Sequence, residues 1–302
     1  MNKQIRNLYK LPHVFRCVHD VHRHFKSELS PFYILTEKKC YPDGCVYFHW
    51  KCRLLAKHKK CFRGFSHVGQ KCANCSYYYE EKQHHYPEII LSGDEQSSFL
   101  EEFAEFEEWI SELKSKRIPC EGIIANVIPD LSLKRQGKIQ RLRANGFLIR
   151  FDEGFIDNRF FADPFYLSVS AMTQNELLLR KGDSLEFQAA LTIDRGRFKF
   201  TSSGRFYFDR RGEERALRKT DVMVALKTYT IQEGQPGKCR QCDSGVLVDL
   251  LSAKTGPSRV IVCLQGIADF QYCIESVNTS KSNDQDSCIN PGWGRTNCHH
   301  VL

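Results

Sequence analysis

The chain has 302 residues, of which 41% are hydrophobic and 26% charged, so it can form two or three small folded domains and is too apolar to be disordered throughout. It contains no apolar run of about 18 residues and no signal-type hydrophobic segment, which argues against a membrane span, against a membrane partner and against secretion. We therefore expect a cytoplasmic, reducing environment. Residues 1–75 carry 15 Lys and Arg against 4 Asp and Glu, within a net charge of +8, and this basic N-terminal part favours a polyanionic partner such as DNA or RNA.

The first 39 residues mix bases with histidines, and the segment from Val14 to Phe25 is consistent with a short helix. On such a helix His19 and His22 would lie one turn apart, at a spacing that allows metal ligation. No close pair of cysteines accompanies them, so a basic, solvated helix face is the preferred interpretation.

Six cysteines follow between residues 40 and 75, and they are Cys40, Cys45, Cys52, Cys61, Cys72 and Cys75. Disulfides are rare in a reducing compartment, whereas closely spaced thiolates still bind metal there. The first two and the last two cysteines each form a close pair followed by aromatic residues, which is half of a zinc ribbon. This repeat predicts one zinc ion bound by Cys40, Cys45, Cys72 and Cys75. The remaining two thiols either complete a second site or are ordinary buried cysteines, and an iron-sulfur cluster is an alternative cofactor for the whole group.

Apolar residues then recur at helical spacing between residues 92 and 116, which predicts one long amphipathic helix with an acidic outer face. The apolar stripe consists of Phe99, Phe103, Phe106, Ile110 and Leu113. We expect it to dock on a neighbouring domain or, as a second hypothesis, on a protein partner.

Residues 117–232 are rich in β-branched and aromatic residues between turn signals. Strands are expected at 118–128, 146–156, 158–170, 184–194 and 197–208, with a short helix over 173–180. Three strands, a helix and two strands is the order of elements in an OB-fold, a small five-stranded barrel. The expected class is therefore mainly β with α (α+β): a five-stranded OB-like barrel flanked by two small zinc-binding modules and the long helix.

A second cysteine group follows the barrel segment. Cys239 and Cys242 form a knuckle with Gly245 directly after it, and Cys263 and Cys273 return further thiols from a predicted hairpin. This is the plan of a zinc ribbon, although the second pair is spaced more widely than is usual.

These patterns divide the chain into five segments. They are a basic Cys-rich metal-binding module at 1–91, the acidic helix at 92–116, the barrel at 117–232, the zinc ribbon at 233–276 and a disordered tail at 277–302.

Bases alternate with aromatic residues near the end of the barrel segment, so that bases on one strand face would hold phosphates while exposed rings stack on bases. The candidate contacts are Arg195, Arg197, Lys199, Arg205, Tyr207, Arg210 and Arg211, together with Lys57, Lys59, Lys60 and Arg63 of the basic module. Many of the neighbouring phenylalanines are expected to fill the barrel interior instead.

In broad plan, residues 117–275 resemble OB-fold proteins that carry zinc ribbons, a group that includes single-strand-binding replication proteins and RNA-modifying or translation-associated factors. The resemblance rests on the order of elements and on the four cysteines of the second group, and it implies binding of single-stranded DNA or RNA. Similar pairs of barrel and ribbon also occur in acyl-carrier-associated proteins, which bind no nucleic acid.

The sequence lacks the phosphate-loop, dinucleotide, nucleophile-elbow, HExxH and deaminase motifs. The function expected is nucleic-acid binding with structural zinc sites. The alternatives are a protein-interaction scaffold and an enzyme that uses a metal or an iron-sulfur cluster in the N-terminal module.

Overall fold

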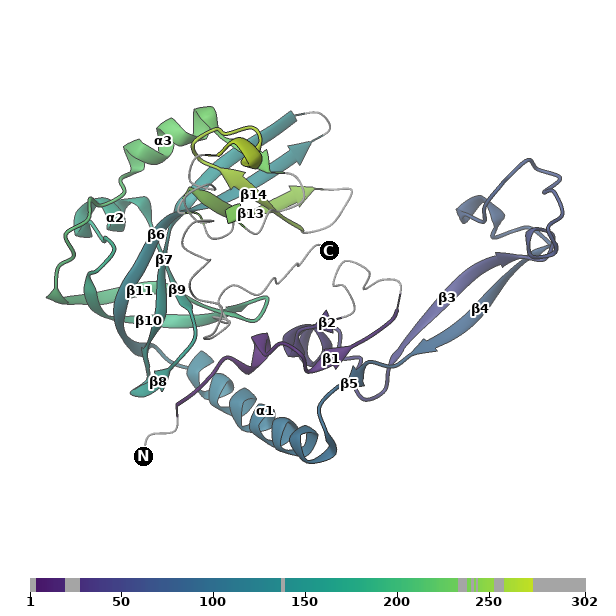
Figure 1. Cartoon of the computed structure of the whole chain (residues 1–302), viewed down its shortest axis with the longest axis horizontal. Helices are drawn as coiled ribbons and strands as arrows, with labels where there is room; N and C mark the ends of the chain where they lie inside the picture. Colours follow the sequence, from purple (N-terminus) through teal and green to yellow (C-terminus); the bar gives the residue numbers. More distant parts are fainter. Residues whose placement is uncertain are drawn as a thin grey trace. The chain divides into compact units, whose positions relative to one another are not determined.

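The computed structural model describes residues 4–19, 28–136, 139–232, 238–239, 242, 244–252 and 258–273. Over these residues the protein is mainly β with few helices, which confirms the expected class at that level. Contacts divide the chain into two compact units (Figure 1): residues 12–92, here called the hairpin unit, and residues 1–11 with 93–302, here called the ring unit.

The hairpin unit combines a small three-stranded sheet with a separate two-stranded hairpin. The sheet has the order β2-β1-β5 and consists of β1 (Phe15–Arg16), β2 (Glu28–Leu29) and β5 (Glu88–Ile89). The hairpin pairs β3 (Cys45–Cys52) with β4 (Tyr78–His85) along their whole length. The remaining elements are the π-helix η3 (Phe32–Glu37) and the 3-10 helices η4 (Leu55–Lys57) and η5 (Gln70–Cys72).

The helix expected over Val14–Phe25 is wrong at its start, where the chain forms β1. Phe15 lies between Leu29 of β2 and Ile89 of β5, and it is fully buried by this pairing. Burial of the ring between two strands outweighs the weak local preference for a helix, because isolated short helices are marginal in water. Residues 20–27, which include the remainder of the expected helix, lie outside the described part of the chain.

Five strands of the ring unit pair in a cyclic order. They are β6 (Ile118–Gln136), β7 (Ile139–Ile156), β9 (Phe165–Val169), β10 (Ser184–Asp194) and β11 (Arg197–Arg210). Strand β6 pairs with β10, β10 with β11, β11 in parallel with β9, and β9 with β7, which pairs in turn with β6. The short strand β8 (Arg159–Phe161) turns back and pairs antiparallel with the end of β7, and helix α2 (Ala171–Leu177) separates β9 from β10. The expected order of strands, helix and strands is therefore present.

Alternating side chains supply the core of the ring unit. Along β9, Phe165, Leu167 and Val169 are buried and the residues between them are partly exposed, as the two-residue period of a strand requires. The ring of Phe151 stacks on Phe165 at 4.8 Å and on Phe187 at 5.6 Å. Many of the phenylalanines in this segment are thus structural.

Helix α1 (Gly93–Lys114) confirms the predicted amphipathic helix, and its apolar stripe packs inside the ring unit. Phe106 and Trp109 meet Phe198 of β11 at ring-centroid distances of 6.0 and 5.9 Å. The hypothesis that this stripe docks on a protein partner is corrected by this packing, because the stripe is already covered by its own chain.

The N-terminal segment also packs on the ring unit. The ring of Tyr9 lies edge-on to Phe106 at 5.1 Å, and the backbone N–H of Asn7 donates to Asp163 Oδ2 at 2.7 Å. Residues 1–11 accordingly belong with the ring unit, whereas the sequence-based boundaries placed them in the Cys-rich module.

Strands β6 and β7 run beyond the ring as a long hairpin, to which three C-terminal strands are added. Strand β13 (Gly245–Ser252) pairs in parallel with the end of β6, and β14 (Ser258–Cys263) and β12 (Thr230–Gln232) continue the sheet. Leu133 of β6 lies opposite Leu250 of β13, and both are buried. This burial explains why β6 continues past the expected end of the strand at residue 128. The remaining helices are α3 (Lys219–Thr228), η1 (Leu8–Lys10) and η6 (Phe270–Tyr272).

No helix in the described residues has both the length and the apolar character needed to cross a membrane. The tail over 277–302, which the sequence predicts to be disordered, lies outside the described residues.

Replacing Trp109 by Ala should lower the free energy of unfolding of the ring unit by about 3–5 kcal/mol, because the change leaves a cavity beside Phe161 and Phe198. The matched control, Glu108→Ala on the exposed face of the same helix, should change it by less than about 0.5 kcal/mol. Urea unfolding of both variants measures the difference, and equal stabilities would show that α1 does not seal this core.

Candidate metal centres and nucleic-acid surface

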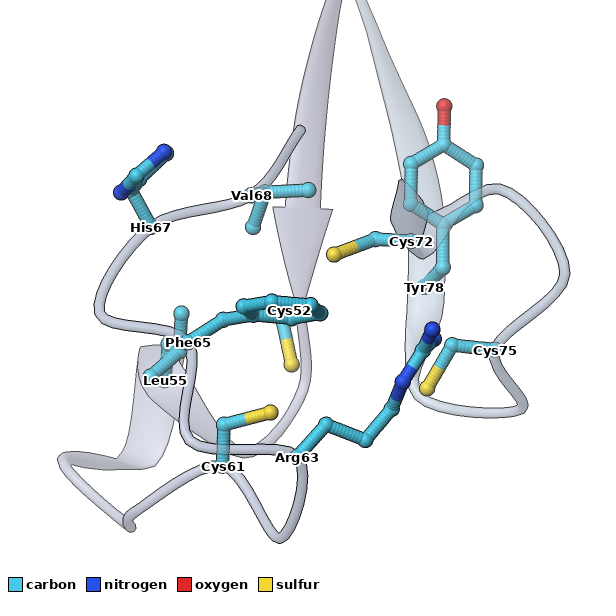
Figure 2. Close-up of a pocket in the computed structure, with 10 residues that line it drawn as sticks. All are labelled: Cys52, Leu55, Cys61, Arg63, Phe65, His67, Val68, Cys72, Cys75 and Tyr78. Atoms are coloured by element: carbon cyan, nitrogen blue, oxygen red, sulfur yellow. The ribbon is translucent and has the colours of Figure 1, made fainter. Parts of the chain in front are cut away.

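Four cysteines meet at the distal end of the β3–β4 hairpin, here called the tip (residues 53–77 with Cys52). Cys52 ends β3, Cys61 follows η4, Cys72 ends η5 and Cys75 precedes β4. All four line one pocket together with Arg63, Phe65 and Tyr78 among others. In Figure 2 the sulfur atoms of Cys52 and Cys61 point toward each other, and that of Cys72 is directed into the same space from the other side of the pocket.

The tip has no hydrophobic core of its own. Residues 53–77, all of which the structure describes, contain no strand, no α-helix and no buried side chain. A loop of this length whose only regular structure is two single turns of 3-10 helix needs some other source of order, because fixing each residue costs about 1–2 kcal/mol of conformational entropy. The four cysteines that line one pocket are the available source.

The predicted pairing of the first cysteine group differs from what the structure brings together. Cys45 begins β3 and pairs with His85, whereas Cys52 ends the same strand and pairs with Tyr78. Seven strand steps of about 3.3 Å separate the two ends by roughly 23 Å. The first close pair therefore lies too far from Cys72 and Cys75 to share one ion with them, and the two thiols left over in the sequence-based pairing take its place at the tip.

No group of three or more His, Cys, Asp or Glu side chains in the described residues already stands at metal-binding distances. The side chain of Arg63 crosses the tip pocket, where Nη1 donates to the backbone oxygen of Lys71 at 3.0 Å. Thiolates at such a position suit zinc in tetrahedral geometry, and they also suit an iron-sulfur cluster.

The cysteines of the C-terminal group, Cys239, Cys242, Cys263 and Cys273, also lie near one another. Burial raises the pKa of the Cys239 thiol, and the nearby thiols of Cys263 and Cys273 raise it further. The sulfur of Cys242 accepts a hydrogen bond from the backbone N–H of Ser244 at 3.4 Å. The predicted knuckle and the end of β14 are therefore neighbours, while residues 240, 241 and 243 of the knuckle lie outside the described part.

Gly245 is required by the turn that carries this knuckle. A Cβ atom at this position would lie 1.8 Å from the backbone oxygen of Cys239, which no side chain tolerates. The backbone N–H of Gly245 donates to the oxygen of Cys242 at 3.0 Å, so the glycine closes the turn.

Several of the basic residues proposed to contact nucleic acid are used inside the ring unit. Lys199 pairs with Asp130 at 3.0 Å, and Arg211 pairs with Asp183 at 3.3 Å and lies over the ring of Phe208. These charges are neutralised within the fold and are therefore poorly placed to attract phosphate.

Arg195 and Arg197 join a network that attaches the C-terminal sheet to the ring. Arg259 of β14 donates to both carboxylate oxygens of Asp194, at 2.9 and 2.7 Å, and through Nε to Asp249 at 2.6 Å. Arg197 also pairs with Asp194, and Arg195 lies 4.0 Å from Asp249. Burial raises the pKa of Asp194, but the two guanidinium groups outweigh burial and hold the pKa below its usual range.

The other candidates of this segment, Arg205, Tyr207 and Arg210, are exposed on the second half of β11, and Tyr207 is 64% exposed. They remain available to a ligand.

The tip carries the most uniform positive charge of the chain. Residues 44–79 contain seven Lys and Arg and no Asp or Glu. Lys57, Lys59 and Lys60 are exposed, and none of them forms an ion pair with any residue that the structure describes. Phe62 is 70% exposed and packs edge-on against Tyr77 at the same tip.

Two further surfaces were not found from the sequence. Phe48 and Trp50 share one face of β3 and are 47% and 46% exposed, a pattern that the alternation along this strand could have revealed. On the β6–β7 extension Lys134 lies directly opposite Arg141, and Arg143 shares their face. Like charges placed opposite each other destabilise a strand pair unless an anion neutralises them.

A search against protein-family models, curated proteins and solved structures finds no match for this chain.

Replacing Asp194 by Asn should lower the free energy of unfolding by about 3 kcal/mol, because Arg197 and Arg259 lose their shared counter-charge in a partly buried position. Since the folded state holds the pKa of Asp194 low, its contribution exists above the unfolded pKa of about 3.9 and is lost as the pH falls further. The difference from wild type should therefore shrink below about pH 4. The exposed Asp209→Asn is the control, and a pH-independent difference would contradict the role of the carboxylate.

Proposed function

We propose that this protein binds single-stranded DNA or RNA through the hairpin unit, whose tip is held by a structural zinc ion, and through an OB-type barrel formed by the cyclic strands of the ring unit. The observation that carries the proposal is the combination, on one hairpin, of an acid-free basic tip with exposed aromatic rings.

The barrel assignment is supported by the strand order. In chain order the five strands are β6, β7, β9, β10 and β11. The third, β9, pairs in parallel with the fifth, β11, and helix α2 lies between the third and the fourth. This is the arrangement expected for an OB-type barrel, a fold that binds oligonucleotides on the face of its second and third strands. The added C-terminal sheet with its four cysteines is consistent with a zinc ribbon that serves as a staple.

Zinc at the tip is supported by the donor set and by the missing core. The proposed ligands are Cys52, Cys61, Cys72 and Cys75. A zinc ion bound by four thiolates would fix four points of a loop that buries nothing else, so metal binding and folding of the tip would be one event.

The tip has the properties that a single strand requires. Lys57, Lys59 and Lys60, which form no ion pair with any described residue, can neutralise phosphates and release counterions. Phe62 and Tyr77 at the tip and the Phe48–Trp50 face of β3 offer rings on which bases stack, a contact worth about 1–3 kcal/mol per base. The Lys134–Arg141 face of the β6–β7 extension is a second phosphate-binding surface, located on the ring unit.

Charge reversal of two tip lysines, Lys59→Glu with Lys60→Glu, should weaken binding to an oligothymidine or oligouridine probe. If each lysine neutralises one phosphate, the slope of log K against log salt should become less steep by about 1.4, which is two contacts at about 0.7 each for a single strand. Fluorescence anisotropy over a salt series measures this slope.

The control for this experiment reverses two exposed lysines of α3, Lys219→Glu with Lys227→Glu, which changes the net charge equally. It should leave the slope near the wild-type value. Absence of binding to any oligonucleotide, or equal slopes in the two double variants, would contradict the proposal.

Replacing Cys61 by Ser should release one zinc ion per chain, open residues 53–77 to proteolysis and lower affinity for the oligonucleotide. Cys61→His should preserve the ion, because imidazole is an equivalent ligand. Elemental analysis, limited proteolysis and anisotropy on the same samples decide the outcome. A brown protein with bound iron would favour the cluster alternative, and unchanged metal content in Cys61→Ser would refute a tip site.

A second candidate function, docking of a protein partner, is favoured by the exposed row of Val46, Phe48 and Trp50 on one face of β3. It predicts a complex that survives nuclease treatment and is lost when Phe48 and Trp50 are replaced by Ala.

A further inference from the structure

A second group of metal-ligand side chains lies at the opposite end of the β3–β4 hairpin, here called the base cluster. Cys17 and His19 follow β1, and Cys40 and Cys45 flank the turn that enters β3. The sulfur of Cys45 lies 3.5 Å from His19 Nδ1. Cys17 and Cys40 are each 4% exposed and His19 is 6% exposed, so these three side chains are shielded from solvent, whereas Cys45 is partly exposed. The sequence-based view of His19 as part of a solvated helix face is therefore wrong.

The segments that carry these cysteines pack against each other. The ring of Phe15, two residues before Cys17, lies 5.5 Å from the ring of Tyr41, which follows Cys40. Cys17 and Cys40 are both buried in this part of the hairpin unit. Thiolates gathered there would repel one another, and a divalent cation among them removes that repulsion.

The one direct contact in the cluster has the length of an edge of a zinc tetrahedron. A Zn–S bond of about 2.3 Å and a Zn–N bond of about 2.0–2.1 Å, at the tetrahedral angle, place sulfur and nitrogen roughly 3.6 Å apart. The separation between Cys45 Sγ and His19 Nδ1 is 3.5 Å.

We propose that Cys17, His19, Cys40 and Cys45 form a zinc centre of three thiolates and one imidazole, separate from the tip.

The backbone around the cluster holds its donors in place. The N–H of Gly44 donates to the oxygen of Cys40 at 2.6 Å, and Gly44 has φ +76°, a conformation that favours glycine. A Cβ atom at Gly44 would lie 2.9 Å from the backbone oxygen of His85, so the turn fits closely against the end of β4. The ring of His85 stacks on His19 at 4.3 Å and 20°, which orients the ligating imidazole without being a ligand itself.

The base cluster also has a structural reason to bind metal. It joins three segments of the hairpin unit: the end of β1, the turn before β3 and, through the stacked His85, the end of β4. The three strands of the small sheet are only two residues long each, so this sheet contributes few hydrogen bonds to hold the segments together. A bound ion supplies a connection that the small core does not.

The test is the number of zinc ions per full-length chain, measured by elemental analysis after purification under reducing conditions. Cys17→Ser and Cys45→Ser should each lose one ion, and their combination should lose no more. Cys45→Ser combined with Cys72→Ser should lose two, because those residues belong to different sites. Cys120→Ser, a buried thiol outside the cysteine groups, is the matched control and should lose none.

A second measurement separates ligation from simple misfolding. With cadmium in place of zinc, each site gives its own ¹¹³Cd resonance at a position set by the number of thiolates. His19→Cys should keep the metal content and move a single resonance from the three-thiolate to the four-thiolate class, whereas His85→Ala should keep both content and class.

The proposal is overturned if Cys17→Ser retains all metal or if the Cys45 and Cys72 double variant loses a single ion. It is also overturned if two of Cys17, Cys40 and Cys45 form a disulfide in the protein purified under reducing conditions. Failure of a tip site would appear separately, as unchanged metal content in Cys72→Ser while Cys17→Ser still loses one ion.

Discussion

The tip of the β3–β4 hairpin has to be ordered without a single buried side chain, and the other end of the hairpin has only a small core around Phe15, Tyr33 and Ile34. None of residues 53–77 is buried, and the sheet at the other end has strands of two residues. At the tip, hydrophobic burial cannot offset the conformational entropy of the ordered chain, and at the other end the core that offsets it is small. The sulfur and imidazole groups stand at both ends of the ribbon, where that deficit is greatest. On this view the cysteines replace a core and leave the outer faces free for a ligand.

The ring unit, in contrast, is ordered by a hydrophobic core. Its cyclic strand order encloses stacked aromatic rings such as Phe151 and Phe165, and helix α1 closes one side through Trp109. The bases near this core are neutralised by carboxylates, as in the network around Asp194. Among the residues that the structure describes, Lys57, Lys59 and Lys60 at the tip and Lys134, Arg141 and Arg143 on the β6–β7 extension form no ion pair. A base near a carboxylate is used inside the fold, and a base without one nearby can bind a ligand.

The spacing of apolar residues in the sequence predicts many of the helices and strands. The helix at Gly93–Lys114 was predictable because its stripe repeats at helical spacing, and β10 matched the expected strand at both ends. The β6–β7 extension is not evident from the sequence, because Pro129 precedes the short alternation at Leu131 and Leu133 and the polar run over residues 134–136 follows it. Both leucines pair with β7, and Leu133 also pairs with β13, more than a hundred positions later. The strand at Phe15 likewise depends on pairing with a distant segment, β5.

The sequence alone determined the donor types, the uneven charge and the element order of the ring, since each depends on residues close together in the chain. Only the tertiary structure decided which thiols are neighbours. Spacing suggested that Cys45 belongs with Cys72, yet the register of one antiparallel hairpin places them at opposite ends and brings Cys52 and Cys61 to the tip instead. Packing of the segment after β1 against this end of the hairpin brings His19 to Cys45 and His85. Proximity across a hairpin depends on strand pairing, which is a long-range property that no local motif records.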